Sequence, residues 1–158
     1  MMECLLKYLP LFTPIILGVI GYFITAYFAK SSKQIAKDNM MKELFKDFNS
    51  RYDKLNNNLV RLDKDKPSLE ELKKIADYDE YHQTIIDFFN LCAEEFYWYH
   101  HKKRIDPIVW NSWQKGMNYW YNNIPAIQQL WEKEIENDGK VSYYIIDRNE
   151  FFTKSTAS

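Results

Sequence analysis

The organisation of this chain is decided by the stretch Leu11-Phe-Thr-Pro-Ile-Ile-Leu-Gly-Val-Ile-Gly-Tyr-Phe-Ile-Thr-Ala-Tyr-Phe-Ala29. No charged side chain interrupts it, and as a helix it extends about 28 Å, close to the hydrocarbon thickness of a bilayer. A cleaved signal peptide is the alternative, but bulky Tyr27 and Phe28 stand where a cleavage site needs small residues. We therefore predict one transmembrane helix over residues 11–29, preceded by a short N-terminal flank, residues 1–10.

Basic residues on the two sides of this stretch predict its orientation. The N-terminal side carries Lys7, whereas the C-terminal side carries Lys30, Lys33, Lys37, Lys42 and Lys46. Because basic flanks stay on the cytoplasmic side, we expect the N-terminus outside a bacterial inner membrane and the C-terminal domain in the cytoplasm. Gly18 and Gly21 share a helix face on which membrane helices can approach closely, so we also expect a homo-oligomer.

Composition favours helices for the rest of the chain. Only 4 of the 158 residues are glycine and 5 are proline, so long helices with short connections are expected. The net charge of −1 gives no basic excess for double-stranded DNA. The two cysteines, Cys4 and Cys92, do not make a disulfide framework. The predicted fold class is all-α: one transmembrane helix followed by a small cytosolic helical bundle.

Apolar spacing and capping residues divide this bundle into elements. A 3–4 spacing from Met41 to Leu62 predicts a juxtamembrane amphipathic helix over residues 30–62, which either packs on its own domain or also pairs between protomers. The helical domain, residues 63–158, then contains a capping box at Ser68 and a short helix to about residue 76. Further helices are predicted over residues 79–103, after Asp106-Pro107 and from Pro125. Residues 141–152 stay ambiguous, because their β-branched run suggests a strand that has no partner.

Residue patterns for chemistry are scarce. The soluble part has two glycines and no glycine-rich phosphate loop, and the sequence has no CxxC or HExxH metal motif. Glu94 and Glu95 are adjacent on a predicted helix, so their side chains point in different directions and make no catalytic pair. We therefore predict no enzyme activity, no cofactor and no metal.

The strongest candidate for a binding site is a basic and aromatic run. Cations beside aromatic faces and amides suit phosphates and stacked bases. The alternative is a core helix whose basic end interacts with the helix dipole or with lipid headgroups. The predicted ligand-binding residues are Trp98, Lys102, Lys103, Arg104, Asn111 and Lys115.

Two resemblances extend this interpretation. The stretch Ile85–Trp131 resembles segments of small bacterial membrane-anchored proteins of unknown function, through Phe89-Asn-Leu-Cys-Ala-Glu-Glu95, Arg104-Ile-Asp106, Trp110, Trp113, Gly116-Met117 and Trp131. This likeness implies a helical bundle and no known chemistry.

In architecture, the chain resembles the membrane effectors of type III CRISPR systems, which join a short membrane segment to a small cytosolic helical domain. That resemblance implies binding of cyclic oligoadenylate and action as an oligomer at the membrane, but no ligand motif matches residue by residue. We therefore expect a membrane-anchored ligand-sensing effector in antiviral defence. The alternative is a membrane-anchored scaffold that binds another protein.

Overall fold

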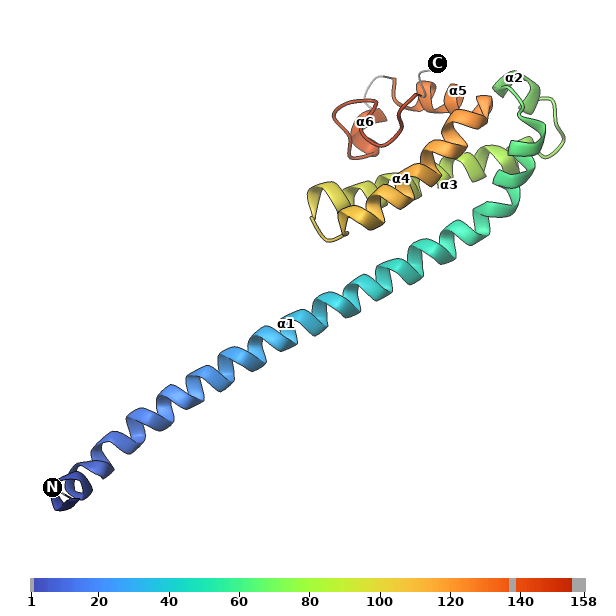
Figure 1. Ribbon diagram of the computed structural model, residues 1–158. Helices are drawn as coiled ribbons and strands as arrows, with labels where there is room; N and C mark the ends of the chain where they lie inside the picture. Colours follow the sequence, from blue (N-terminus) through green and yellow to red (C-terminus); the bar gives the residue numbers. More distant parts are fainter. Residues whose placement is uncertain (1, 137–138, 155–158) are drawn as a thin grey trace. The chain divides into compact units, whose positions relative to one another are not determined.

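The computed structural model describes residues 2–136 and 139–154, with side chains from Thr13 onward. Two compact units make up the chain, Met1–Glu43 and Leu44–Ser158. Helix α1 (Met2–Asp65) begins in the first unit and ends in the second (Figure 1). Every regular element of the described residues is helical and none is a strand, which confirms the all-α fold class.

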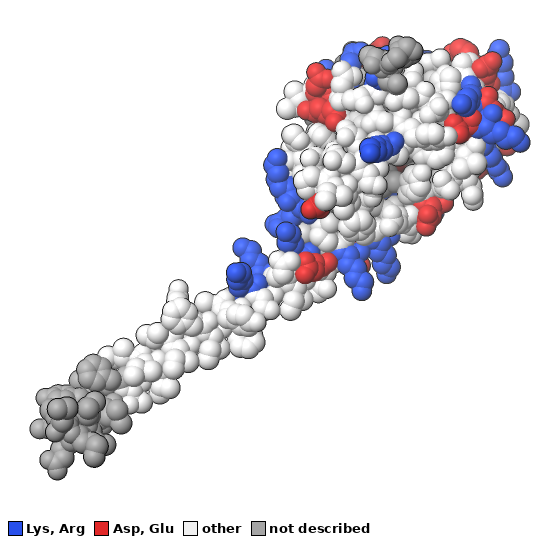
Figure 2. All heavy atoms as spheres, in the orientation of Figure 1, with Lys and Arg blue, Asp and Glu red and all other residues white. Residues whose placement is uncertain are grey.

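The first unit consists of the N-terminal part of α1. Among the described residues, α1 from Thr13 onward is the one helix long and apolar enough to cross a membrane. Figure 2 shows the segment next to the grey N-terminal atoms without charged side chains, whereas charged side chains are scattered over the visible surface of the second unit. The helix begins at Met2, so the backbone of residues 2–10 of the predicted flank is helical as well. This part of α1 is therefore a candidate membrane span.

Two polar features of this segment suit an apolar surrounding. The hydroxyl of Thr25 donates to the carbonyl oxygen of Gly21 at 2.8 Å, so it needs no partner outside the helix. A Cβ atom added at Gly18 or Gly21 would meet no other atom within 4 Å, so both positions are open in this chain. Whether a second membrane helix packs on them stays a prediction.

The second unit is built around the last turns of α1. Phe48, Leu55, Leu59 and Leu62 are buried there, so this part of the predicted apolar stripe packs within its own unit. The remaining elements are α2 (Leu69–Leu72), α3 (Tyr78–Phe96), the π-helix η1 (Tyr97–His101), α4 (Pro107–Asn123), α5 (Pro125–Glu134) and α6 (Gly139–Ser142).

The local signals in the sequence set most helix starts. Ser68 and Glu71 form the predicted capping box of α2. Helix α4 begins at Pro107, and its N-cap is Asp106, whose side chain accepts a hydrogen bond from the Ile108 amide at 2.8 Å. However, α2 ends at Leu72 rather than near residue 76, because the amides of Lys74 and Ile75 bond to carbonyls three residues back.

The end of the long third helix also differs from its prediction. The helix predicted over residues 79–103 is α-helical only to Phe96, and a π-helical turn follows it. The amide of Lys102 bonds to the carbonyl oxygen of Tyr97, five residues back, at 3.0 Å. This wider turn changes the directions in which the aromatic side chains of residues 97–101 point.

Residues 141–152, whose structure the sequence left ambiguous, form no strand. After α6 the segment follows turns, and the side chains of Tyr143, Phe151 and Phe152 are buried. Its backbone is bonded by a side chain of α4: Asn118 donates to the carbonyl oxygen of Phe151 at 3.2 Å and accepts the amide of Thr153 at 2.7 Å. An amide side chain thus replaces the partner strand that a β-branched run would otherwise need.

Aromatic rings fill the core that these elements enclose. The ring centroids of Phe89 and Trp131 lie 5.0 Å apart, and those of Trp131 and Phe151 lie 5.1 Å apart. Tyr121 stacks on Phe152 at 4.7 Å. Such ring pairs add to the free energy that burial provides.

Candidate functional site

Three of the four cations in the predicted binding run are consecutive, and all three are exposed. Lys102, Lys103 and Arg104 follow η1, and Lys103 adopts a left-handed backbone conformation with φ of 53°. The amide of Arg104 bonds back to the carbonyl oxygen of Trp98 at 3.0 Å. Among the described residues, no carboxylate forms an ion pair with any of the three. Their charges are therefore available to an anion.

The other predicted binding residues differ in exposure and in the element that carries them. Trp98 is half-buried in η1, whereas Asn111 and Lys115 are exposed one turn apart on α4. None of the six predicted residues lines either of the two cavities described below. The structure therefore does not gather the predicted run into one pocket.

One of the cations contacts an aromatic ring that in turn packs on a residue of a cavity lining. The Nζ atom of Lys102 lies 5.3 Å from the centroid of the Tyr97 ring, within range of a cation–π contact. The Tyr97 ring in turn lies 5.0 Å from the ring of Tyr144. Tyr144 lines the larger cavity, so a chain of two aromatic rings connects Lys102 with it.

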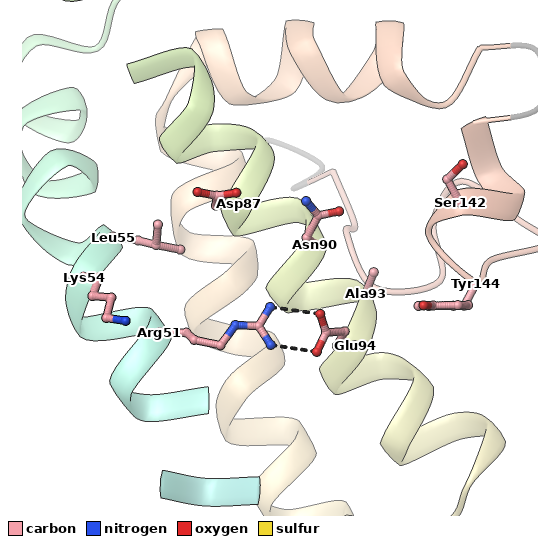
Figure 3. Close-up of a pocket in the computed structure, with 9 residues that line it drawn as sticks. All are labelled: Arg51, Lys54, Leu55, Asp87, Asn90, Ala93, Glu94, Ser142 and Tyr144. Atoms are coloured by element: carbon pink, nitrogen blue, oxygen red, sulfur yellow. Dashed lines mark hydrogen bonds and ion pairs between the residues drawn. The ribbon is translucent and has the colours of Figure 1, made fainter. Parts of the chain in front are cut away.

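This larger cavity is an open cleft of about 440 Å³ between α1, α3 and the segment that includes α6 (Figure 3). Its volume falls in the range of small-molecule sites. The lining is polar and carries both signs of charge. Its members are Arg51, Lys54, Leu55, Asp87, Asn90, Ala93, Glu94, Ser142 and Tyr144.

An ion pair joins two walls of the cleft. The guanidinium of Arg51 on α1 donates to both carboxylate oxygens of Glu94 on α3, at 2.7 and 2.9 Å (Figure 3). Asp47 contributes a longer contact of 3.5 Å to the same guanidinium. The hydrogen bond to Glu94 raises the pKa of Arg51, and this bidentate geometry fixes both side chains.

The remaining polar groups of the cleft are freer. Lys54 forms no ion pair with a described residue, and Asn90 is exposed. Tyr144 has φ of 59°, and its carbonyl oxygen lies 3.0 Å from Nε2 of His101. Around the fixed Arg51–Glu94 pair, the cleft therefore offers one ammonium group without an ion pair to a described residue, the Asp87 carboxylate, an amide and an aromatic ring.

A second, smaller cavity lies on another side of α3. It measures about 180 Å³, and its lining includes Asn49 and Tyr52 of α1, Glu95 of α3 and Trp113 of α4. Glu95 is only 8% exposed, and no hydrogen bond or ion pair joins its carboxyl to any residue that the structure describes. Burial raises the pKa of Glu95 from 4.5 to about 8, against the opposing effect of the Arg51 charge.

Sequence reasoning placed the two adjacent glutamates correctly but did not find their environments. It predicted that Glu94 and Glu95 point in different directions, and they line different cavities. It did not identify Glu95 as buried. The signal was present, because Glu95 follows Phe88 by seven residues and Cys92 by three, and so lies on the apolar stripe of its helix.

Two further observations bear on function. Among residues 13–136 and 139–154, no three histidine, cysteine, aspartate or glutamate side chains are grouped closely enough to hold a metal ion. Comparisons with protein families, with curated proteins and with solved structures find no match to this chain.

Proposed function

We propose that this chain is a non-enzymatic, membrane-anchored sensor whose second unit binds a nucleotide ligand in the Arg51–Glu94 cleft. In the most specific form of this proposal, the ligand is a cyclic oligoadenylate and the chain acts in type III CRISPR antiviral defence. Binding would be passed to membrane helices that associate as an oligomer, with the second unit on the cytoplasmic side of a bacterial inner membrane.

The observation that carries the proposal is the double role of α1. Its apolar N-terminal part is the candidate membrane span, and the same helix supplies Arg51, Lys54 and Leu55 to the cleft. A ligand that contacts these residues acts directly on the helix that would cross the membrane. Coupling between sites needs such a shared element, whose equilibrium both sites can bias.

The chemistry of the cleft suits a nucleotide unit. The Tyr144 ring can stack on a base, the Asn90 amide can bond to a base edge, and the Lys54 ammonium can pair with a phosphate. Lys102, held on Tyr97 next to Tyr144, adds a second cation at the rim for a ligand with several phosphates. Lys103 and Arg104 follow Lys102 directly and are exposed as well.

The alternative function, a scaffold for another protein, is favoured by one observation. Val141 and Ile146, on either side of the cleft residue Tyr144, are 76% and 82% exposed. Apolar side chains left in water near a polar cleft are typical of protein interaction sites. In this alternative a partner protein, rather than a nucleotide, covers the segment.

Calorimetric titration of the full chain in detergent micelles tests the sensor. The ligands are AMP, cyclic tetra-adenylate and cyclic hexa-adenylate. Because a charge-assisted hydrogen bond contributes about 1.5–3 kcal/mol, Lys54→Ala is expected to weaken binding about tenfold or more. Arg104→Ala tests the adjoining basic surface in the same way.

The matched control is Lys74→Ala, which removes an exposed lysine that lines neither cavity. It is expected to bind as the unaltered chain does. If the unaltered chain binds none of the three ligands, or if Lys54→Ala binds as tightly, the sensor proposal fails. The scaffold then becomes the leading function.

Membrane orientation is tested separately. An enzyme that is active only outside the cytoplasm is fused after Ser158. The lysines that follow the apolar segment predict that this fusion is inactive, whereas the same enzyme fused before Met1 is active. The opposite pattern contradicts both the orientation and an intracellular ligand.

A further inference from the structure

The carboxyl of Glu95 lies outside the Arg51–Glu94 cleft and lines the smaller cavity. Its carboxyl is buried in the second unit, yet no hydrogen bond or ion pair reaches it from a described residue. Its oxygens keep a little contact with solvent, since among the described residues the fully buried side-chain oxygen without a partner is Oδ1 of Asp63. Burial still disfavours the charged form of the Glu95 carboxyl when no cation pairs with it. Its side chain lines the 180 Å³ cavity, so a bound molecule could supply the missing partner.

None of the ionisable groups around Glu95 acts as the partner of its carboxyl. Arg51 is the nearest cation that affects it, but that guanidinium is already held by both oxygens of Glu94. Tyr52 on α1 and Cys92 on α3 also line the cavity, and burial raises the pKa of both groups. The residues that α4 contributes to the lining are uncharged. They are Ser112, Trp113, Gly116 and Met117.

The cavity is apolar at its floor and open at its rim. Phe88, Leu91 and Cys92 are fully buried at the floor with Glu95. Asn49, Ser112 and Gly116 are exposed at the rim. A Cβ atom added at Gly116 would meet no atom within 4 Å, so this side of the rim is not closed. A small molecule can therefore reach Glu95 from solvent.

We propose that this cavity binds a small organic ammonium ion, with its charged group on the Glu95 carboxylate and its short apolar stem against Leu91 and Met117. The Trp113 ring, which also lines the cavity, adds an aromatic face that attracts cations. The volume of about 180 Å³ admits a short alkylammonium ion but is smaller than typical drug-sized sites. This site is thus separate from the nucleotide cleft, and it does not depend on the function proposed for that cleft.

The test is a titration of the full chain, in one detergent, with n-butylammonium chloride and with n-butanol as its uncharged counterpart. We expect n-butylammonium to bind at least about tenfold more tightly than n-butanol, because only the cation pairs with Glu95. Binding must displace the Glu95 proton, so the affinity for the cation is expected to rise about tenfold per pH unit from about pH 6 to pH 8. The affinity for n-butanol is expected to stay constant over that range.

Two variants examine the site directly. Glu95→Gln keeps the shape of the neutral side chain and removes its charge, so it is expected to lose the preference for the cation and the pH dependence together. Gly116→Leu places an apolar side chain over the rim and is expected to weaken both probes. Glu136→Gln, at an exposed position outside the cavity, is the matched control and is expected to bind as the unaltered chain does.

Three results would overturn the proposal. The first is equal affinity of the unaltered chain for n-butylammonium and n-butanol. The second is unchanged binding of the cation by Glu95→Gln, with the melting temperature of that variant showing that it is folded. The third is an affinity for the cation that does not vary between about pH 6 and pH 8.

Discussion

Glu94 and Glu95, two neighbouring residues of α3, differ in burial and in their partners. Glu94 lies in the larger cleft, where the Arg51 guanidinium holds both of its oxygens and its side chain is 42% exposed. Glu95, the next residue, is buried in the smaller cavity without a partner among the described residues. The 100° step between consecutive helix residues is sufficient to separate the two environments. Chemical identity and position in the sequence are therefore poor guides to what each carboxyl contributes.

The difference has a physical consequence for stability. An exposed ion pair gains little, because water screens its charges and two long side chains must be ordered. An unpaired buried carboxyl changes the free energy of unfolding by far more, because its charged form is strongly disfavoured in the folded state. We thus expect Glu95 to dominate the pH dependence of stability, although Glu94 forms the visible contact.

The largest expected effect is on the pH profile of unfolding. Because the folded pKa of Glu95 is about 8 and the unfolded value is near 4.5, the folded state retains a proton that the unfolded state loses. The contribution of Glu95 to the free energy of unfolding is therefore fully present below about pH 4.5, and it is lost as the pH rises through about 8. Between about pH 6 and pH 9 the loss amounts to about 2–3 kcal/mol.

Glu95→Gln removes this titrating group. Denaturant unfolding of the variant at several pH values, followed by tryptophan fluorescence, is expected to lack the loss that the unaltered chain shows. The comparison uses the difference between the two proteins, so that the titration of groups that Glu95 does not influence cancels. Parallel profiles would mean that Glu95 titrates near its ordinary pKa, and the contrast with Glu94 would then disappear.

Sequence reasoning reached the helices because their signals are local. The capping box at Ser68 and the pair Asp106-Pro107 act within one turn, so they could be recognised without tertiary structure. The apolar spacing of α3 likewise follows from its own residues. The π-helical turn after Phe96 could not be predicted from such rules, since its hydrogen bonds replace ordinary helical ones without a clear change in residue type.

The cavities lay beyond sequence reasoning for a different reason. The cleft joins Arg51, Asn90 and Tyr144, three residues separated by dozens of positions, and their approach depends on tertiary packing. The predicted basic run lies within one stretch of the sequence, but none of its members lines either cavity. The C-terminal segment was ambiguous because its order depends on side-chain amides of α4 rather than on its own pattern.

A smaller change in the free energy of unfolding is expected from a substitution at Gly116, on the rim of the Glu95 cavity. Gly116 is an exposed position inside α4, and an added Cβ atom would meet nothing within 4 Å. Replacing it by alanine lowers the backbone entropy of the unfolded chain, so Gly116→Ala should stabilise the second unit by about 0.5–1 kcal/mol. Thermal unfolding measures the gain. A loss of stability would mean that the rim is closed in solution and that Glu95 is sealed.

The smallest expected effect concerns the ion pair that dominates the cleft in the structure. The side chains of Arg51 and Glu94 are 32% and 42% exposed, so their attraction is screened by water. Unfolding of Arg51→Ala, Glu94→Ala and the double variant gives a coupling free energy of about 0.5 kcal/mol, which decreases as salt is added. A coupling above about 2 kcal/mol that persists in concentrated salt would contradict this prediction, because it would mean that the cleft excludes water around the pair. In that case the two carboxyl groups would differ in their partners but not in their burial, and the cleft would be a closed site rather than an open one.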